Sequence, residues 1–154
     1  MRRAAFYLLV VVVVLALVCS YGAAKNETLD ELKARFESAH SDERAELAIR
    51  IAQYQLRNAD KLYNDGQADP ARAAVDDIVT YSEKARDAVA QNKKHLKHVE
   101  IDVRKMAEKL RDIKRTLAFE DQPPVEHAIR RLEDIRTTLL KEMFAKEIEK
   151  EEKK

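Results

Sequence analysis

The fold is decided by residues 71–119, which read ARAAVDDIVTYSEKARDAVAQNKKHLKHVEIDVRKMAEKLRDIKRTLAF. Neither Gly nor Pro, the residues that most often end a helix, interrupts this stretch. Apolar or small residues recur along it at spacings that alternate between four and three, the heptad pattern of a coiled coil. The heptad positions are Ala71, Val75, Ile78, Ser82, Ala85, Val89, Asn92, Leu96, Val99, Val103, Met106, Leu110, Ile113 and Leu117. This pattern predicts one long helix over residues 70–119.

The heptad pattern is weakest around residues 91–94, which are all polar (Gln-Asn-Lys-Lys). A break at this point would fold the two halves of the helix back on each other and give a compact four-helix bundle. We favour the continuous helix, because none of these residues is a true helix breaker. The compact bundle is the alternative.

Two further helices are expected before the long one. Thr28 and Glu31 have the spacing of a capping box, which predicts a short helix over about residues 28–39. Ser41 is a favoured N-cap residue, and Gly66 suits the left-handed position that follows a helix, so a second helix is expected over residues 42–65. Asp69 is the expected cap of the long helix.

A last helix is expected over residues 124–149, because the preceding segment Glu-Asp-Gln-Pro-Pro ends the long helix. At a rise of about 1.5 Å per residue, the helices 42–65 and 124–149 together match the length of the long helix. We therefore predict an all-α fold, in which two elongated antiparallel hairpins share one central helix and carry the short N-terminal helix. Phe119 and Phe144 are expected to close the two ends of the second hairpin.

Residues 1–24 have the order of a secretory signal peptide, with Arg2 and Arg3, then an apolar run, then small residues up to Ala24. Cleavage after Ala24 would leave a helical domain over residues 25–145 and a charged tail over 146–154 that frays. An uncleaved membrane anchor over residues 4–24 is the alternative, since this uncharged run is long enough to span a bilayer. Lipidation of Cys19 is a third alternative. Each of them places residues 25–154 outside the cytoplasm, as a periplasmic, secreted or membrane-anchored protein.

A group of bulky and small residues surrounds the turn at Gly66. They are Ala59 and Leu62 before the turn, and Ala71, Val75 and Ile78 after it. With this spacing, residues 52–85 resemble a single tetratricopeptide repeat, although Gln55 stands at the usual position of Trp and no second copy follows. The resemblance implies two closely crossing helices and a role in protein binding.

Catalysis and cofactor binding are not expected. The one Cys of the chain lies in the N-terminal segment, so residues 25–154 hold no thiolate metal site or disulfide. Ser38 and Ser41 flank His40, but no third group is placed by the sequence to orient that His. His95 and His98 are the candidates for a metal site, against the simpler interpretation that they are solvated residues on a helix surface.

Two groups of residues are candidates for binding a partner. Residues 91–118 hold nine Lys or Arg against four Asp or Glu, a basic patch suited to an acidic partner. Three tyrosines, a residue type favoured in recognition surfaces, fall in the N-terminal hairpin. The candidate partner-binding residues are Tyr54, Tyr63, Tyr81, Lys93, Lys94, Lys97, Arg104, Lys105 and Met106.

These features predict an exported, non-enzymatic scaffold or adaptor of the cell envelope that binds a protein partner or associates with itself as a homo-oligomer. The main argument is that a two-helix hairpin leaves part of its apolar stripe uncovered. The alternatives are a periplasmic holdase-type chaperone, acting through Met106 and Met143, and a small metal-binding helical bundle. Nucleic acid is not an expected partner, and a membrane is expected only through an uncleaved N-terminal segment.

Overall fold

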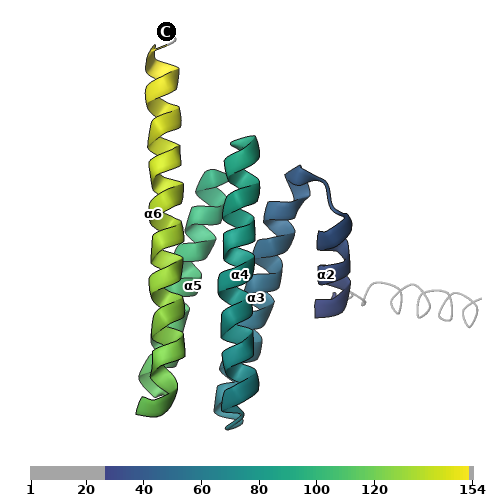
Figure 1. The fold of residues 1–154 in the computed structure, drawn as a ribbon, viewed down its shortest axis with the longest axis vertical. Helices are drawn as coiled ribbons and strands as arrows, with labels where there is room; N and C mark the ends of the chain where they lie inside the picture. The colour runs from purple at the N-terminus through teal and green to yellow at the C-terminus, as the bar shows by residue number, and fades with distance from the viewer. Residues whose placement is uncertain (1–26, 153–154) are drawn as a thin grey trace, which may run out of the picture.

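The computed structural model describes residues 27–152, which form an all-α fold without a strand in that range. The helices are α2 (Leu29–Ser38), α3 (Ser41–Asn64), α4 (Ala68–Asn92), α5 (Leu96–Thr116) and α6 (Gln122–Glu152), with a short 3₁₀ helix η1 (Phe119–Asp121) before α6. Figure 1 shows α3 to α6 side by side, with the chain reversing direction at each turn. The predicted all-α class is confirmed.

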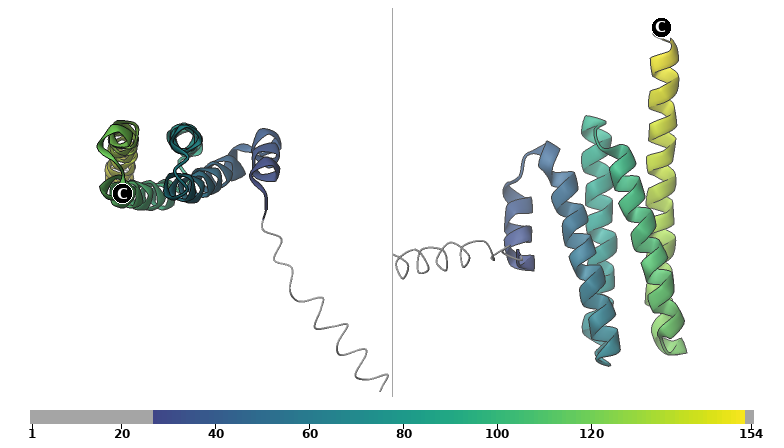
Figure 2. Two further views of the ribbon diagram at one scale, coloured as in Figure 1. Left: turned by 90° about the horizontal axis from the view of Figure 1, so that it is seen from below. Right: turned by 180° about the vertical axis from the view of Figure 1, so that it is seen from behind.

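The four long helices pack as two antiparallel hairpins. The most extensive contacts join α3 to α4 and α5 to α6, and the two hairpins meet where α4 packs on α6 and α3 on α5. In the end-on view of Figure 2, α2 lies at the outer edge of the first hairpin, away from α5 and α6. The molecule is therefore a four-helix bundle with one short helix added at its side.

The predicted continuous helix over residues 70–119 is wrong, and the alternative break is found near the place where the heptad pattern is polar. Helix α4 ends at Asn92 and α5 begins at Leu96. Lys93 and His95 between them adopt left-handed backbone conformations, with φ of 56° and 61°. Such a conformation costs roughly 1–2 kcal/mol per non-glycine residue. Burial of even two or three apolar side chains of α5 outweighs this cost, at about 1.5–3 kcal/mol for each.

The heptad positions do mark the core on both sides of the break. Helices α4 and α5 bury every one of them except Asn92, whose side chain is not described: Ala71, Val75, Ile78, Ser82, Ala85, Val89, Leu96, Val99, Val103, Met106, Leu110 and Ile113. Leu117, beyond the end of α5, is partly buried. The stripe that was expected to need a partner is thus covered within the chain.

The helix ends agree with the sequence at two places. Thr28 and Glu31 form the predicted capping box, because each side chain accepts a hydrogen bond from the backbone N–H of the other residue. After α3, Gly66 has the left-handed φ of 71°. Its N–H donates to the carbonyl of Tyr63 at 3.1 Å, and the N–H of Gln67 donates to that of Leu62 at 2.8 Å. These two hydrogen bonds make a Schellman motif, as the glycine predicted.

Other boundaries differ from the prediction by one to three residues. The N-cap of α3 is His40 instead of Ser41. Helix α4 begins at Ala68, so Asp69 lies inside its first turn and is not its cap. Helix α6 begins at Gln122 and continues to Glu152, well into the charged segment 146–154 that was set apart as a tail. Prolines in the first turn are compatible with these starts, since the N–H groups there have no partner in the helix.

No helix within residues 27–152 has both the length and the apolar composition needed to cross a membrane. The predicted signal peptide, membrane anchor and lipidated Cys19 lie outside the described residues.

Candidate functional site

Tyr81 does not belong to an exposed aromatic patch, because α2 covers it. Its side chain is only 7% exposed and meets the ring of Phe36 edge to face. Lys84 lies over both rings, at 4.7 Å from the Tyr81 centroid and 5.1 Å from that of Phe36. Burial raises the pKa of the Tyr81 hydroxyl above its ordinary value. Tyr81 therefore anchors α2 and is not available to a partner in this fold.

Gln55, which the predicted tetratricopeptide resemblance puts at the usual position of Trp, takes part in a network that holds α2 in place. Gln55 is 5% exposed and donates a hydrogen bond from Nε2 to Oδ2 of Asp77. The same oxygen accepts from Lys33 Nζ of α2 at 3.1 Å. A polar group of this kind is tolerated inside a helical core when it is hydrogen-bonded. The network joins α2, α3 and α4, and the likeness of α3–α4 to a tetratricopeptide hairpin stays a prediction.

Among the described residues, the other two tyrosines make no ring contact with Tyr81 or with each other. Tyr54 is half-buried on α3, with the guanidinium of Arg57 at 5.8 Å from its ring. Tyr63 lies near the end of α3, and its hydroxyl is buried without a hydrogen-bond partner among the described residues. Desolvation raises the pKa of that hydroxyl. The three predicted tyrosines therefore do not form one surface.

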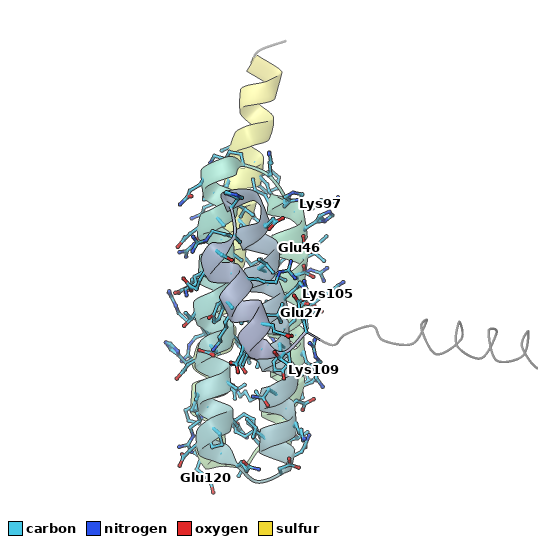
Figure 3. All side chains as sticks on the ribbon, turned by 90° about the vertical axis from the view of Figure 1, so that its right-hand side faces the viewer. Glu27, Glu46, Lys97, Lys105, Lys109 and Glu120 are labelled. Atoms are coloured by element: carbon cyan, nitrogen blue, oxygen red, sulfur yellow. The ribbon has the colours of Figure 1, made fainter. Side chains whose placement is uncertain are left out.

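The predicted basic residues of α5 are mostly exposed, but acidic residues stand among them. Figure 3 shows Lys97, Lys105 and Lys109 in order along one edge of the face that carries α2. Lys109 pairs with Asp60 of α3 at 3.0 Å. The surface is thus a band of mixed charge and not a purely basic patch.

The remaining predicted basic residues make local contacts. Lys93 Nζ lies 3.2 Å from Glu142 of α6, and Arg104 pairs with Glu108 one turn along α5 at 3.1 Å. Lys94 is exposed in the turn between α4 and α5. Met106 differs from the other candidates, since it is 2% exposed inside the bundle and cannot touch a partner there.

His95 and His98 line a groove of about 370 Å³ between α3 and α5. Their rings are stacked with centroids 6.1 Å apart. The apolar side chains of the groove come from Ala45, Ile49 and Val99, and the other lining residues are Glu46, Arg50, Gln53 and Asp102. In the described part of the chain, no group of three or more His, Cys, Asp or Glu side chains is arranged to hold a metal ion.

The second hairpin contains an ion pair that the sequence analysis missed. Glu100 on α5 is 8% exposed and accepts a hydrogen bond from Nε of Arg136 on α6 at 2.7 Å. Its position next to the heptad residue Val99 was the available signal, since residues beside a heptad stripe often carry interhelical ion pairs. Toward the other end of the same hairpin, Glu126 accepts a hydrogen bond from Lys114 at 3.1 Å, which lowers the pKa of that carboxyl group.

Phe119 and Phe144 are the exposed large apolar residues of the described chain. They were expected to close the ends of the second hairpin, and this prediction is wrong. Phe119 is 85% exposed in η1, just before α6, and Phe144 is 61% exposed near the other end of that helix. At the end of the hairpin that carries the turn between α5 and α6, the side chain of Gln122 donates to the carbonyl of Leu117 at 3.1 Å.

Ser38 and His40, the described members of the predicted serine and histidine group, make local contacts. The hydroxyl of Ser38 donates to the carbonyl oxygens of Ala34 and Arg35 on its own helix. His40 serves as the N-cap residue of α3 without a side-chain cap hydrogen bond.

No protein-family model, curated protein or solved structure matches this chain. A functional assignment must therefore come from the exposed and buried residues of the chain itself.

Proposed function

We propose that this chain is an exported, non-enzymatic protein-interaction module that serves as a scaffold or adaptor of the cell envelope. The observation that carries the proposal is the exposure of Phe119, in η1 just before α6, and of Phe144, in the C-terminal part of α6, which are 85% and 61% exposed. Exposed aromatic side chains on a charged surface are common anchors of protein interfaces. The partner is accordingly a protein that covers one of these rings with apolar side chains.

The scaffold differs from the one that the heptad pattern suggested. The apolar stripe of α4 and α5 is buried in the bundle, so the partner does not bind by completing it. The surfaces on which a partner is expected to bind are the two regions around Phe119 and Phe144 and the band of mixed charge along α3 and α5.

The structure offers less support for the two other functions. A holdase-type chaperone was to hold its clients through Met106 and Met143, but Met106 is buried and Met143 is partly buried against the core. The predicted metal-binding bundle depends on His95 and His98 as ligands. Among the described residues, no group of three or more potential ligands is arranged around them to hold a metal ion. Neither function is therefore favoured by a specific observation.

The proposal is tested by photo-cross-linking in cells that make the full chain. A benzophenone amino acid replaces Phe119 or Phe144 in turn, and Thr80, exposed on α4, in the control. We expect a defined cross-linked partner from a phenylalanine position and none from position 80. The partner is then identified and purified, and Phe144→Ala or Phe119→Ala is expected to weaken its binding by about tenfold or more. Equal cross-linking from all three positions would contradict the proposal.

Export is tested separately on the same cells. We expect the mature chain to be recovered outside the cytoplasm with Lys25 as its first residue, because cleavage after Ala24 suits the signal-peptide pattern. Recovery of the chain in the cytoplasm with residues 1–24 attached would overturn this part of the proposal.

A further inference from the structure

A groove of about 530 Å³ lies where the turn between α2 and α3 meets the C-terminal half of α4. Figure 1 shows that turn and the C-terminal end of α4 at the same end of the molecule. Apolar side chains of Phe36, Ala39 and Ala88 line the groove, together with the basic residues Arg44 and Lys84. Arg44 belongs to α3 and Lys84 to α4, so a ligand in the groove meets basic side chains from two helices.

These two basic side chains lie on aromatic rings and not against acidic residues. The guanidinium carbon of Arg44 is 4.7 Å from the centroid of the Phe36 ring. Lys84 Nζ is 5.1 Å from the same centroid and 4.7 Å from that of Tyr81. Neither makes an ion pair with a residue that the structure describes. Every other described arginine except Arg57 pairs with an acidic residue. A contact with a ring uses no N–H donor, so both cations keep their donors for an anion.

Asp87, an acidic residue of the groove, is compensated by a neighbour on its own helix. Its Oδ1 accepts hydrogen bonds from Nε and Nη2 of Arg86 at 2.9 and 2.7 Å, and Arg86 does not line the groove. The charges of Arg44 and Lys84 therefore leave the groove with an excess of positive charge. His40 also lines the groove, and the N–H of its ring is a further donor.

From these cations and the apolar side chains beside them, we propose that the groove binds an organic carboxylate with a small apolar body. The two oxygens of a carboxylate accept parallel N–H groups of a guanidinium, and an ammonium adds another charge-assisted hydrogen bond. The apolar body packs on Phe36, Ala39 and Ala88. A phosphate group suits the groove less, because the carboxylate of Asp87 repels its larger charge more strongly. This inference goes beyond the proposed function, since it assigns a small-molecule site that needs no protein partner.

Benzoate is the probe that tests this site, because it joins a carboxylate to an apolar ring. It is titrated into the isotope-labelled full chain in mild detergent, and the NMR signals of the Ala39 and Ala88 amides and of Arg44 Nε–H are followed. We expect saturable shifts of these signals, with a Kd on the order of 1 mM. Benzyl alcohol carries the same ring without the charge and is expected to bind at least about tenfold more weakly. Equal affinity for the two compounds would overturn the proposal.

Variants of the two cations locate the site. Arg44→Met and Lys84→Met keep an apolar stem on the ring and remove the charge, and each is expected to weaken benzoate binding by about tenfold. Arg57→Met is the matched control, because Arg57 lies on the same helix, 5.8 Å from the ring of Tyr54, and does not line the groove. It should bind benzoate as tightly as the parent chain. Unchanged affinity in the first two variants, with the helical circular dichroism spectrum of the parent, would refute the site.

Inorganic phosphate distinguishes an organic carboxylate from anions in general. We expect phosphate to bind more weakly than benzoate, and phosphate binding of equal strength would refute the preference for a carboxylate with an apolar body. The results are separate from those on the proposed function. Failure of benzoate to bind would leave the cross-linking at Phe119 and Phe144 unaffected, and absence of cross-links there would leave the carboxylate site standing.

Discussion

Phe36 of α2 and Tyr81 of α4 meet edge to face, with ring centroids 5.7 Å apart and an interplanar angle of 79°. Both rings are almost fully buried, and Lys84 lies above them. Offset and edge-to-face aromatic pairs contribute about 0.5–1.5 kcal/mol beyond the burial of their surface. This pair is therefore a main anchor of the short helix on the bundle.

Replacing Phe36 by Ala is expected to destabilise the protein strongly. The ring is 2% exposed, and the truncation of a buried Phe typically costs about 3–5 kcal/mol. Urea unfolding followed by circular dichroism measures the loss. The matched control is Phe144→Ala at a ring that is 61% exposed, for which a change within about 0.5 kcal/mol is expected at low protein concentration. Similar losses for the two variants would show that α2 is not anchored by Phe36.

Removing a glycine from one left-handed turn is expected to lower the stability of the protein, and introducing a glycine into another is expected to raise it. Gly66 has φ of 71°, and a Cβ added there would have no atom within 4 Å, so Gly66→Ala suffers only from backbone strain. We expect it to lower the free energy of unfolding by about 1 kcal/mol. His95 has φ of 61° in the turn before α5, and His95→Gly is expected to raise it by about 0.5 kcal/mol. Thermal unfolding measures both, and a stabilising Gly66→Ala would contradict the left-handed turn.

The ion pair between Glu100 and Arg136 is expected to depend on both partners. Arg136→Met leaves the buried carboxylate without its hydrogen bond, and we expect a loss of about 2 kcal/mol. The double variant Glu100→Met/Arg136→Met removes the charge as well as its partner, so its stability should be close to that of the parent protein. A double-mutant cycle by urea unfolding measures the coupling. Additive losses in the two single variants would mean that the pair does not interact.

Stability is expected to fall in acid. Hydrogen bonds from Arg35 and Lys114 lower the pKa values of Glu27 and Glu126 below the ordinary value of 4.5. A group whose pKa is lower in the folded state stabilises the fold above its unfolded pKa, and this contribution is lost as the pH falls through the folded value. The melting temperature should therefore decrease below about pH 4.5, and less steeply for Glu126→Gln. Identical slopes for the two proteins would exclude the contribution of Glu126.

Local signals in the sequence predicted the helical class and most of the core. The heptad spacing placed Val75, Val103 and Leu110 inside, and all three are fully buried. Thr28 and Gly66 marked helix ends through hydrogen bonds that depend only on neighbouring residues. Such features can be recognised without knowing what a helix packs against.

The break between α4 and α5 could not be predicted in the same way. Lys93 and His95 adopt the left-handed conformation, which Lys does not favour and for which His is enriched only in comparison with other non-glycine residues. Neither residue marks such a turn as a glycine would. What stabilises the turn is the packing of α5 on α3 and α6, and those contacts join residues far apart in the sequence. The polar residues at 91–94 showed only where a break would cost least.

For the candidate site, too, the sequence predicted what local pattern decides and missed what packing between distant residues decides. Lys97 and Lys105 are exposed as expected of charged residues outside the heptad stripe. Tyr81 was misjudged because the position of α2 over it was not known. Met106 was named both as a heptad residue and as a partner-binding residue, and its burial agrees with the first role. The heptad spacing thus predicted which side chains are exposed better than the type of residue did.

The order of the helices also bears on how fast the chain folds. Each hairpin pairs helices that follow one another along the chain, α3 with α4 and α5 with α6, so its contacts close only short loops. Proteins dominated by contacts local in sequence fold in microseconds to milliseconds. The later step is the meeting of the two hairpins through α3–α5 and α4–α6, which requires the turn at Lys93 and His95 to be in place. That turn, more than any single helix, should set the folding rate.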